Sequence, residues 1–183
     1  MEILRRISRA IDRFNESLGR LIAWLIPAMI LVGVWNVIGR YLGKAVGQNL
    51  SSNTAIEIQW YLFAIVFLLG AAYTLKHDAH ARMDVLYSRW RPRQQKLADL
   101  AGTLLFLLPF CIVTLWFTWR PVLNSWRIWE NSPNPGGLPV YPIKTVVLVS
   151  LGLLIVQGIS EAYKKWSSLD NSNSPLEDVD GDR

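Results

Sequence analysis

Residues 58–75 read IQWYLFAIVFLLGAAYTL, a run of eighteen positions without one charged side chain. A helix needs roughly 17–25 predominantly apolar residues to cross about 30 Å of hydrocarbon, so this run is long enough to span a membrane. It also lacks the polar face that a helix on the surface of a soluble protein keeps. We therefore predict a transmembrane helix over residues 57–76.

Three further runs of the chain have the same character. Residues 21–39, 100–119 and 145–160 contain no charged side chain, and the last becomes long enough to span when its amphipathic ends are included. The sequence thus predicts an all-α integral membrane protein, with a four-helix transmembrane domain over residues 20–166. The expected spans are about 21–40, 57–76, 99–120 and 140–163.

The segments at either side of this domain differ from it in composition. Residues 1–19 place Ile3, Ile7 and Phe14 on one helical face and arginines on the other. Such a pattern is typical of an amphipathic helix that lies in the membrane interface; a basic face packed on a partner subunit is the alternative. Residues 167–183 are polar and acidic, and we predict a disordered tail there.

Lysine and arginine are distributed unequally among the segments that connect the spans. Fourteen lie in the N-terminal segment, the second loop and the C-terminal tail, and five lie in the first and third loops. Because loops rich in lysine and arginine stay in the cytoplasm, we expect both termini to be cytoplasmic (N-in/C-in). The formal net charge of +5 is explained by the lysines and arginines that set this membrane topology, and it is not a sign of nucleic-acid binding. We therefore expect no nucleic-acid partner.

A charged cluster follows the second span directly, in TLKHDAHARMDV (residues 74–85). A helix would bring His77, His80 and Asp84 to one face, a spacing that metal sites use. A closed metal site, however, needs three or four ligands in a cavity, and no nucleophile accompanies the histidines for acid–base catalysis. We therefore interpret the cluster as a helix end whose cations complement the helix dipole. We predict no metal, no cofactor and no catalytic residue.

The four uncharged runs also lack histidine. Transporters and proton pumps place ionisable residues inside the membrane, where these mark the transport pathway. The chain is poorly equipped to carry a polar solute alone, so we predict an accessory subunit that is not an enzyme. The alternatives are a self-contained small oligomeric transporter, a haem-holding membrane anchor subunit of an oxidoreductase, and a membrane enzyme that uses the His/Asp cluster.

The third loop, residues 120–144, is long and rich in tryptophan and proline. It starts with a helical pattern and is then interrupted at SPNPGGLPVYP, where proline and glycine prevent regular structure. Long loops are usually functional, and tryptophan and arginine dominate energetic hot spots. Candidate residues for docking a periplasmic partner are therefore Arg120, Trp126, Arg127 and Trp129. The alternative is that the tryptophans rest at the lipid interface as an aromatic belt.

Three segments of the chain are similar to a known family: EIQWYLF from Glu57, FLLGAAYTL from Phe67 and HARMDVLY from His80. They resemble the small membrane subunit (Q, or DctQ-like) of tripartite ATP-independent periplasmic (TRAP) transporters. The resemblance implies a location in the bacterial inner membrane and two partners, a large elevator-type membrane subunit and a periplasmic solute-binding protein. It also implies sodium-coupled uptake of an organic acid by the complete system.

The resemblance further implies a division of labour between the subunits. The sodium and substrate sites would belong to the large subunit, which this chain would brace in the bilayer, and this chain is a candidate for helping to dock the binding protein. Candidate residues for structural or intersubunit contacts are then Glu57, Gln59 and Trp60 at the outer face, and His80, Arg82 and Asp84 at the inner face.

Overall fold

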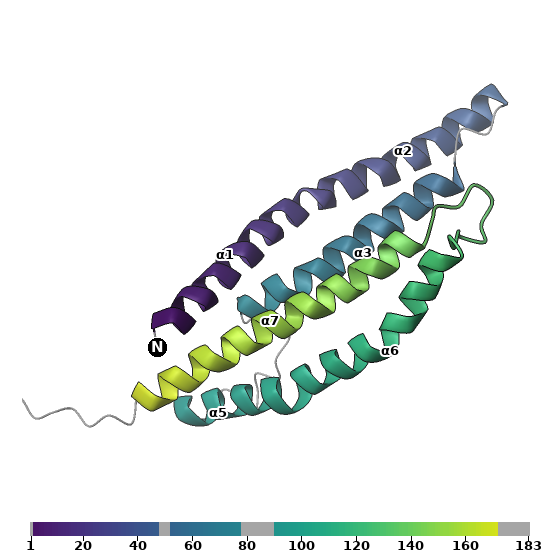
Figure 1. Cartoon of the computed structure of the whole chain (residues 1–183). Helices are drawn as coiled ribbons and strands as arrows, with labels where there is room; N and C mark the ends of the chain where they lie inside the picture. The colour runs from purple at the N-terminus through teal and green to yellow at the C-terminus, as the bar shows by residue number, and fades with distance from the viewer. Residues whose placement is uncertain (1, 48–51, 78–89, 172–183) are drawn as a thin grey trace, which may run out of the picture.

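The computed structural model describes residues 2–47, 52–77 and 90–171 of the 183-residue chain, and these are helical almost throughout. Figure 1 shows long helices lying side by side along one common direction. The elements are α1 (Glu2–Ala23), α2 (Leu25–Val46), α3 (Asn53–Lys76), α5 (Pro92–Gly102), a π-helical turn η1 (Thr103–Leu107), α6 (Leu108–Arg127) and α7 (Tyr141–Asn171).

Four helical segments are long and apolar enough to cross a membrane: Arg5–Val46, Asn53–Lys76, Arg93–Arg127 and Tyr141–Leu169. Each one contains most or all of one predicted span, so the prediction of an all-helical chain with four membrane-capable helices is confirmed. Within the described ranges the only β-type pairing is an isolated bridge between Asn131 and Pro139. The N-in/C-in orientation stays a prediction.

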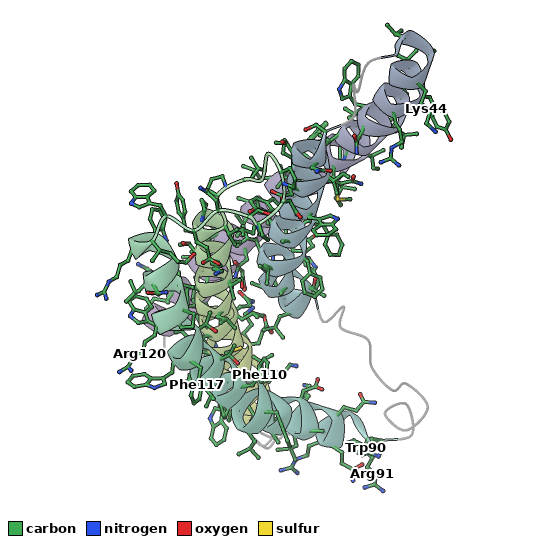
Figure 2. The ribbon with its side chains drawn as sticks, turned by 90° about the vertical axis from the view of Figure 1, so that its right-hand side faces the viewer. Lys44, Trp90, Arg91, Phe110, Phe117 and Arg120 are labelled. Atoms are coloured by element: carbon green, nitrogen blue, oxygen red, sulfur yellow. The ribbon has the colours of Figure 1, made fainter. Side chains whose placement is uncertain are left out.

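Large apolar side chains point away from the bundle, and small or polar ones fill its interior. Trp116 is 79% exposed and Phe117 is 73% exposed, and Figure 2 shows Phe110 and Phe117 on the outward face of α6. This arrangement inverts that of a soluble protein. It suits a lipid environment, because lipid tails are as apolar as leucine and give no hydrophobic driving force for helix association. The helices then associate through close packing and hydrogen bonds. Buried polar residues include Ser8, Asn15, Ser125, Ser150, Gln157 and Ser160.

α1 and α2 follow one another nearly end to end, with a turn at Trp24 between them (Figure 1). The turn has a local cause, because Pro27 lacks the N–H that would donate to the carbonyl of Ala23. α1 packs along α3 and α7, and a Cβ added to Gly19 would lie 2.3 Å from Cδ2 of Tyr73. Glycine therefore permits the close approach of α1 to α3, while the placement of α1 in the membrane interface stays a prediction.

The third membrane-capable segment curves around α7 (Figure 1). At its bend the amide of Leu108 donates to the carbonyl of Thr103, five residues back, and Pro109 has no N–H to restore the α-helical pattern. Across the bend, a Cβ added to Gly158 would lie 2.9 Å from Cδ2 of Leu107. The helix continues beyond the predicted limit of residue 120, to Arg127.

The last helix also extends beyond its predicted span. α7 ends at Asn171, so residues 167–171 are helical although we assigned them to the tail. A helix that has already formed is propagated by one further hydrogen bond per residue, which explains how it can outlast the apolar run. Residues 172–183, the rest of the predicted tail, lie outside the described residues.

Candidate functional site

The end of the bundle that contains the start of α3 is organised by one carboxylate. Glu57 is buried although its residue type is usually exposed. It accepts a hydrogen bond from the Ser132 hydroxyl, one of 2.8 Å from Asn134 Nδ2 and one of 2.6 Å from the backbone amide of Leu138. All three donors come from residues 131–139, which we call the proline loop. A buried charge is stabilised by such multiple donation, so Glu57 ties this loop to α3.

The proline loop closes on itself through its own backbone. The amide of Gly137 donates to the carbonyl of Asn134 over 2.9 Å, and that of Ser132 to Leu138 over 3.0 Å. Gly136 has a φ of 73°, in the left-handed region that side chains disfavour. The prolines and glycines that rule out a helix or strand thus build a defined turn in which donors converge on Glu57.

Two further α3 residues hold the same loop. Thr54 Oγ1 donates to the carbonyl of Gly136 over 2.7 Å, and the Tyr61 hydroxyl donates to the carbonyl of Pro139 over 3.2 Å. Thr54, Glu57 and Tyr61 are spaced three and four residues apart, so they lie on one face of α3. We did not predict Thr54, Tyr61 or the loop donors as site residues, although this spacing was the signal that could have identified the face.

An aromatic cluster borders the proline loop. Trp126 donates from Nε1 to Thr145 Oγ1 over 2.8 Å, and its ring centroid lies 4.4 Å from that of Tyr141. Trp129 stands edge-on to Tyr141 at 5.3 Å and has a φ of 49°, which is unusual for a residue other than glycine. The structure therefore brings two of the four docking candidates, Trp126 and Trp129, together at the junction of α6 and α7.

The two arginine candidates lie apart from this aromatic cluster. Arg120 lines an apolar groove on α6 with Trp116, Phe117 and neighbouring residues; Figure 2 labels it on the same helix as Phe117. Arg127 is exposed at the C-terminal end of α6. The structure does not gather the four docking candidates into one contact.

The six candidates for structural or intersubunit contacts also separate. Glu57 holds the proline loop, Gln59 lies against α2 where a Cβ on Gly33 would meet its Nε2 at 2.9 Å, and Trp60 is 66% exposed. His80, Arg82 and Asp84 lie outside the described residues. The metal-site alternative depends on His80 and Asp84, so the described residues do not test it.

At the opposite end of the bundle, Glu16 of α1 meets the end of α3. Its carboxylate lies 2.6 Å from Lys76 Nζ and 3.0 Å from His77 Nε2, and it also pairs with Arg20 at 3.3 Å. Lys76 and His77 end α3, as predicted for a charged helix end, but their partner on α1 was not predicted. The contact anchors the N-terminal helix to the second span.

A line of buried and partly buried polar contacts, which we call the polar seam, joins α1 to α7. Asn15 Nδ2 donates to Gln157 Oε1 over 2.7 Å, and the Ser8 and Ser160 hydroxyls lie 2.6 Å apart. Lys164 bridges Asp12 and Glu161, at 2.7 Å from each. The polar seam explains why Asn15 and Gln157 are almost fully buried, and α1 thereby becomes part of the bundle.

Polar contacts thus join the helices at both ends of a membrane-capable bundle. Comparison with known proteins shows to which family the chain belongs. The DctQ component of the tripartite ATP-independent periplasmic transporters, as a family, matches residues 29–168. The chain belongs to the DctQ family. Members are transporter components, so this DctQ protein is not an enzyme, and its four apolar helices make it a multi-pass inner-membrane protein. The resemblance seen in the sequence is confirmed.

One relative of this DctQ protein is the C4-dicarboxylate TRAP transporter small permease protein DctQ of Vibrio cholerae serotype O1. The two chains are 31% identical over 131 residues, a match that covers 68% of this chain and 54% of the relative. The chain thus spans about half the length of the curated relative that it matches. No solved structure matches it.

The ion pair beside the aromatic cluster makes the site sensitive to acid. Lys144 donates to the Glu130 carboxylate and holds its pKa below the ordinary value of 4.5. Because the folded-state pKa is the lower one, the stabilisation is present above pH 4.5 and is lost as the pH falls through the lowered pKa. We expect tryptophan fluorescence of the purified protein to change over that acid range, and the change to be smaller in Glu130→Gln. Identical titrations of the two proteins would contradict this role of the pair.

Proposed function

We propose that this chain is the small permease subunit of a sodium-coupled TRAP transporter and braces the large elevator-type subunit in the bilayer. Membership of the DctQ family over residues 29–168 carries the proposal. The four uncharged runs support it, because a subunit without ionisable residues in its apolar core has no evident pathway for a polar solute.

Both ends of the bundle have the construction that a brace requires. Glu57 fixes the proline loop at one end, and at the other the polar seam and Glu16 fix α1 to α7 and α3. Polar interhelical contacts of this kind favour a single arrangement of helices in lipid. A rigid surface of exposed aromatic and aliphatic side chains is thereby presented to the bilayer and to a large membrane subunit.

The substrate of the complete system is proposed to be an organic acid. The name of the Vibrio cholerae relative includes C4-dicarboxylate, which makes a C4-dicarboxylate the first compound to test. In the proposed division of labour, the binding protein and the large subunit select this compound, and our chain does not touch it.

The proline loop and the aromatic cluster are proposed to help dock the periplasmic solute-binding protein. With both termini cytoplasmic, these two features would face the periplasm. The loop is pre-formed by its hydrogen bonds to α3, so little conformational entropy would be lost on docking. Trp129 remains 65% exposed beside it and can supply an aromatic contact, while Arg120 and Arg127 would add charged contacts at the rim.

Reconstitution in proteoliposomes tests the assignment. We expect no sodium-driven uptake of a C4-dicarboxylate by this chain with the binding protein, and uptake once the large subunit is added. Omission of this chain from the complete system should abolish uptake, because the large subunit loses its brace. Sodium-driven uptake by this chain without the large subunit would instead establish a self-contained transporter.

A further inference from the structure

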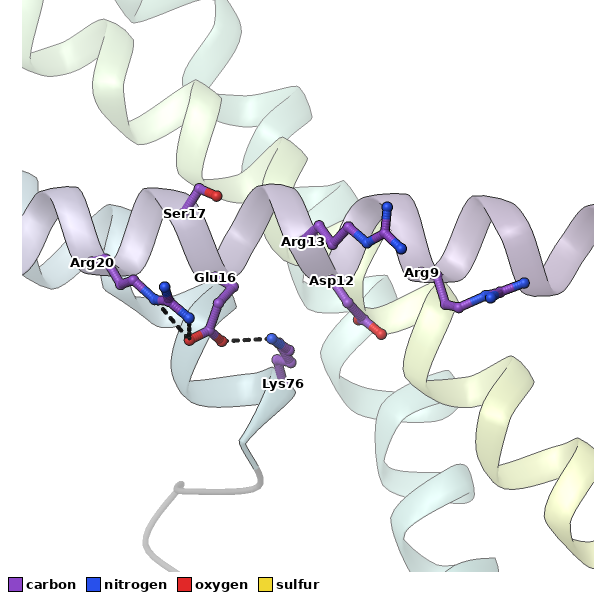
Figure 3. Close-up of a pocket in the computed structure, with 7 residues that line it drawn as sticks. All are labelled: Arg9, Asp12, Arg13, Glu16, Ser17, Arg20 and Lys76. Atoms are coloured by element: carbon purple, nitrogen blue, oxygen red, sulfur yellow. Dashed lines mark hydrogen bonds and ion pairs between the residues drawn. The ribbon is translucent and has the colours of Figure 1, made fainter.

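A groove of about 520 Å³ runs along α1 and reaches the C-terminal end of α3 (Figure 3). Its volume lies within the range of roughly 300–1,000 Å³ that is usual for ligand sites. The charged residues that line it are Arg9, Arg13, Arg20, Lys76, Asp12 and Glu16. We call it the basic groove, since four cations in it outnumber two carboxylates.

Both carboxylates of the basic groove are already engaged. Glu16 pairs with Lys76 and Arg20, as the dashed lines in Figure 3 show. Asp12 pairs with Lys164 of α7 at 2.7 Å. The positive charge that remains is therefore available to an external anion.

Two arginines of the basic groove lack a carboxylate partner among the residues that the structure describes. The side chain of Arg9 donates only to the carbonyl of Arg5, and Arg13 makes no ion pair there. No dashed line reaches either of them in Figure 3. Arg9 and Arg13 stand one helical turn apart, which places them on the same face of α1. Planar guanidinium groups bind the oxygens of a phosphate in pairs, and two neighbouring arginines suit that geometry.

A second feature of α1 indicates where such a phosphate would come from. Ile7, Phe14 and Leu21 recur at seven-residue intervals and are all more than half exposed. Large apolar side chains exposed along one stripe of a basic helix are typical of contact with the acyl region of a membrane surface. The basic groove on the adjoining flank would then lie at the level of the lipid headgroups.

We propose that the basic groove is a binding site for an anionic phosphate group, held by Arg9 and Arg13 and supplied by a phospholipid headgroup. A lipid bound there would attach α1 to the membrane next to the contact of Glu16 with Lys76. The site lies at the opposite end of the bundle from the proline loop, so its occupancy does not depend on the proposed docking or transport.

The test is a binding titration on the full chain in detergent, followed by native mass spectrometry. The probes are phosphatidylglycerol, phosphatidylcholine with the same acyl chains, and inorganic phosphate alone. The groove variant is Arg9→Gln with Arg13→Gln. The matched control is Arg5→Gln with Arg6→Gln, which removes the same charge from exposed positions of α1 outside the groove. Circular dichroism verifies that both variants remain helical.

We expect a one-to-one complex with phosphatidylglycerol that is weakened in the groove variant by roughly twenty-five-fold, taking about fivefold for each of the two basic side chains near an anionic lipid. The control variant should bind within about twofold of the parent, because Arg5 and Arg6 do not line the basic groove. Binding of inorganic phosphate alone, lost in the groove variant, would uphold the site and reassign its source to a free anion. Equal losses in both variants, or equal binding of phosphatidylglycerol and phosphatidylcholine, would overturn the proposal.

Discussion

Glu57→Ala is expected to release the proline loop from α3. The substitution removes the common acceptor of Ser132, Asn134 and the Leu138 amide and leaves these donors without it. A hydrogen bond to a charged acceptor stabilises the closed loop, so the loss of one such bond should raise the equilibrium constant for opening of the loop on the order of tenfold. Since three such bonds are lost together, the loop should exchange its amide hydrogens far faster than in the parent.

Hydrogen exchange of the Ser132 and Gly137 amides measures this opening, because both donate to carbonyls within the loop and keep these acceptors in Glu57→Ala. Gln59→Ala is the matched control, because Gln59 lies on the same helix but contacts α2. Glu57→Gln should fall between the two, since it keeps the shape of the side chain and replaces one acceptor oxygen with a donor. Unchanged exchange at Ser132 and Gly137 in Glu57→Ala would show that the loop holds its shape by its internal bonds alone.

The same variant tests the proposed docking role of the loop. If the binding protein contacts a pre-formed proline loop, then Glu57→Ala should raise the concentration of binding protein needed for half-maximal uptake, because the loop must be ordered again on docking. The complex with the large subunit should still assemble, as the polar seam lies at the other end of α7. An unchanged concentration dependence, with the loop released, would remove the loop from the docking surface.

The second large effect is expected at the polar seam, in Gln157→Leu. Gln157 is fully buried and is the hydrogen-bond acceptor for Asn15. Leucine leaves the Asn15 amide buried and unpaired, which costs about 1–3 kcal/mol of unfolding free energy. Asp12 and Glu161, the other partners of Gln157, are less affected because each keeps Lys164.

A double-mutant cycle separates this effect from a simple change of packing. Asn15→Leu with Gln157→Leu removes donor and acceptor together, so no polar group is stranded and most of the lost stability should return. The free energy of unfolding is measured by titrating the protein from a mild detergent into dodecyl sulfate. A double variant as unstable as the sum of the two single variants would show that the residues act independently.

The prediction of the spans succeeded because hydrocarbon thickness imposes a length on a local run of sequence. IQWYLFAIVFLLGAAYTL meets that length without reference to any other part of the chain, and α3 covers it. Helix ends were less well predicted, because α6 and α7 extend past their apolar runs. A helix ends where its backbone hydrogen bonding ends, and this need not be the end of the hydrophobic run.

The candidate site was predicted only in part. The sequence singled out Glu57 and the tryptophans of the third loop, but it did not show what they touch. Glu57 meets Leu138, 81 positions along the chain, and Asn15 meets Gln157, 142 positions along. A helical pattern in the sequence shows which residues share one face of a helix. It does not show which other helix that face contacts, because several helices carry a polar residue at a similar level of the bundle. Local composition thus determined which segments enter the membrane. Which polar faces pair was decided only by the tertiary packing, because that choice depends on contacts between segments distant in sequence.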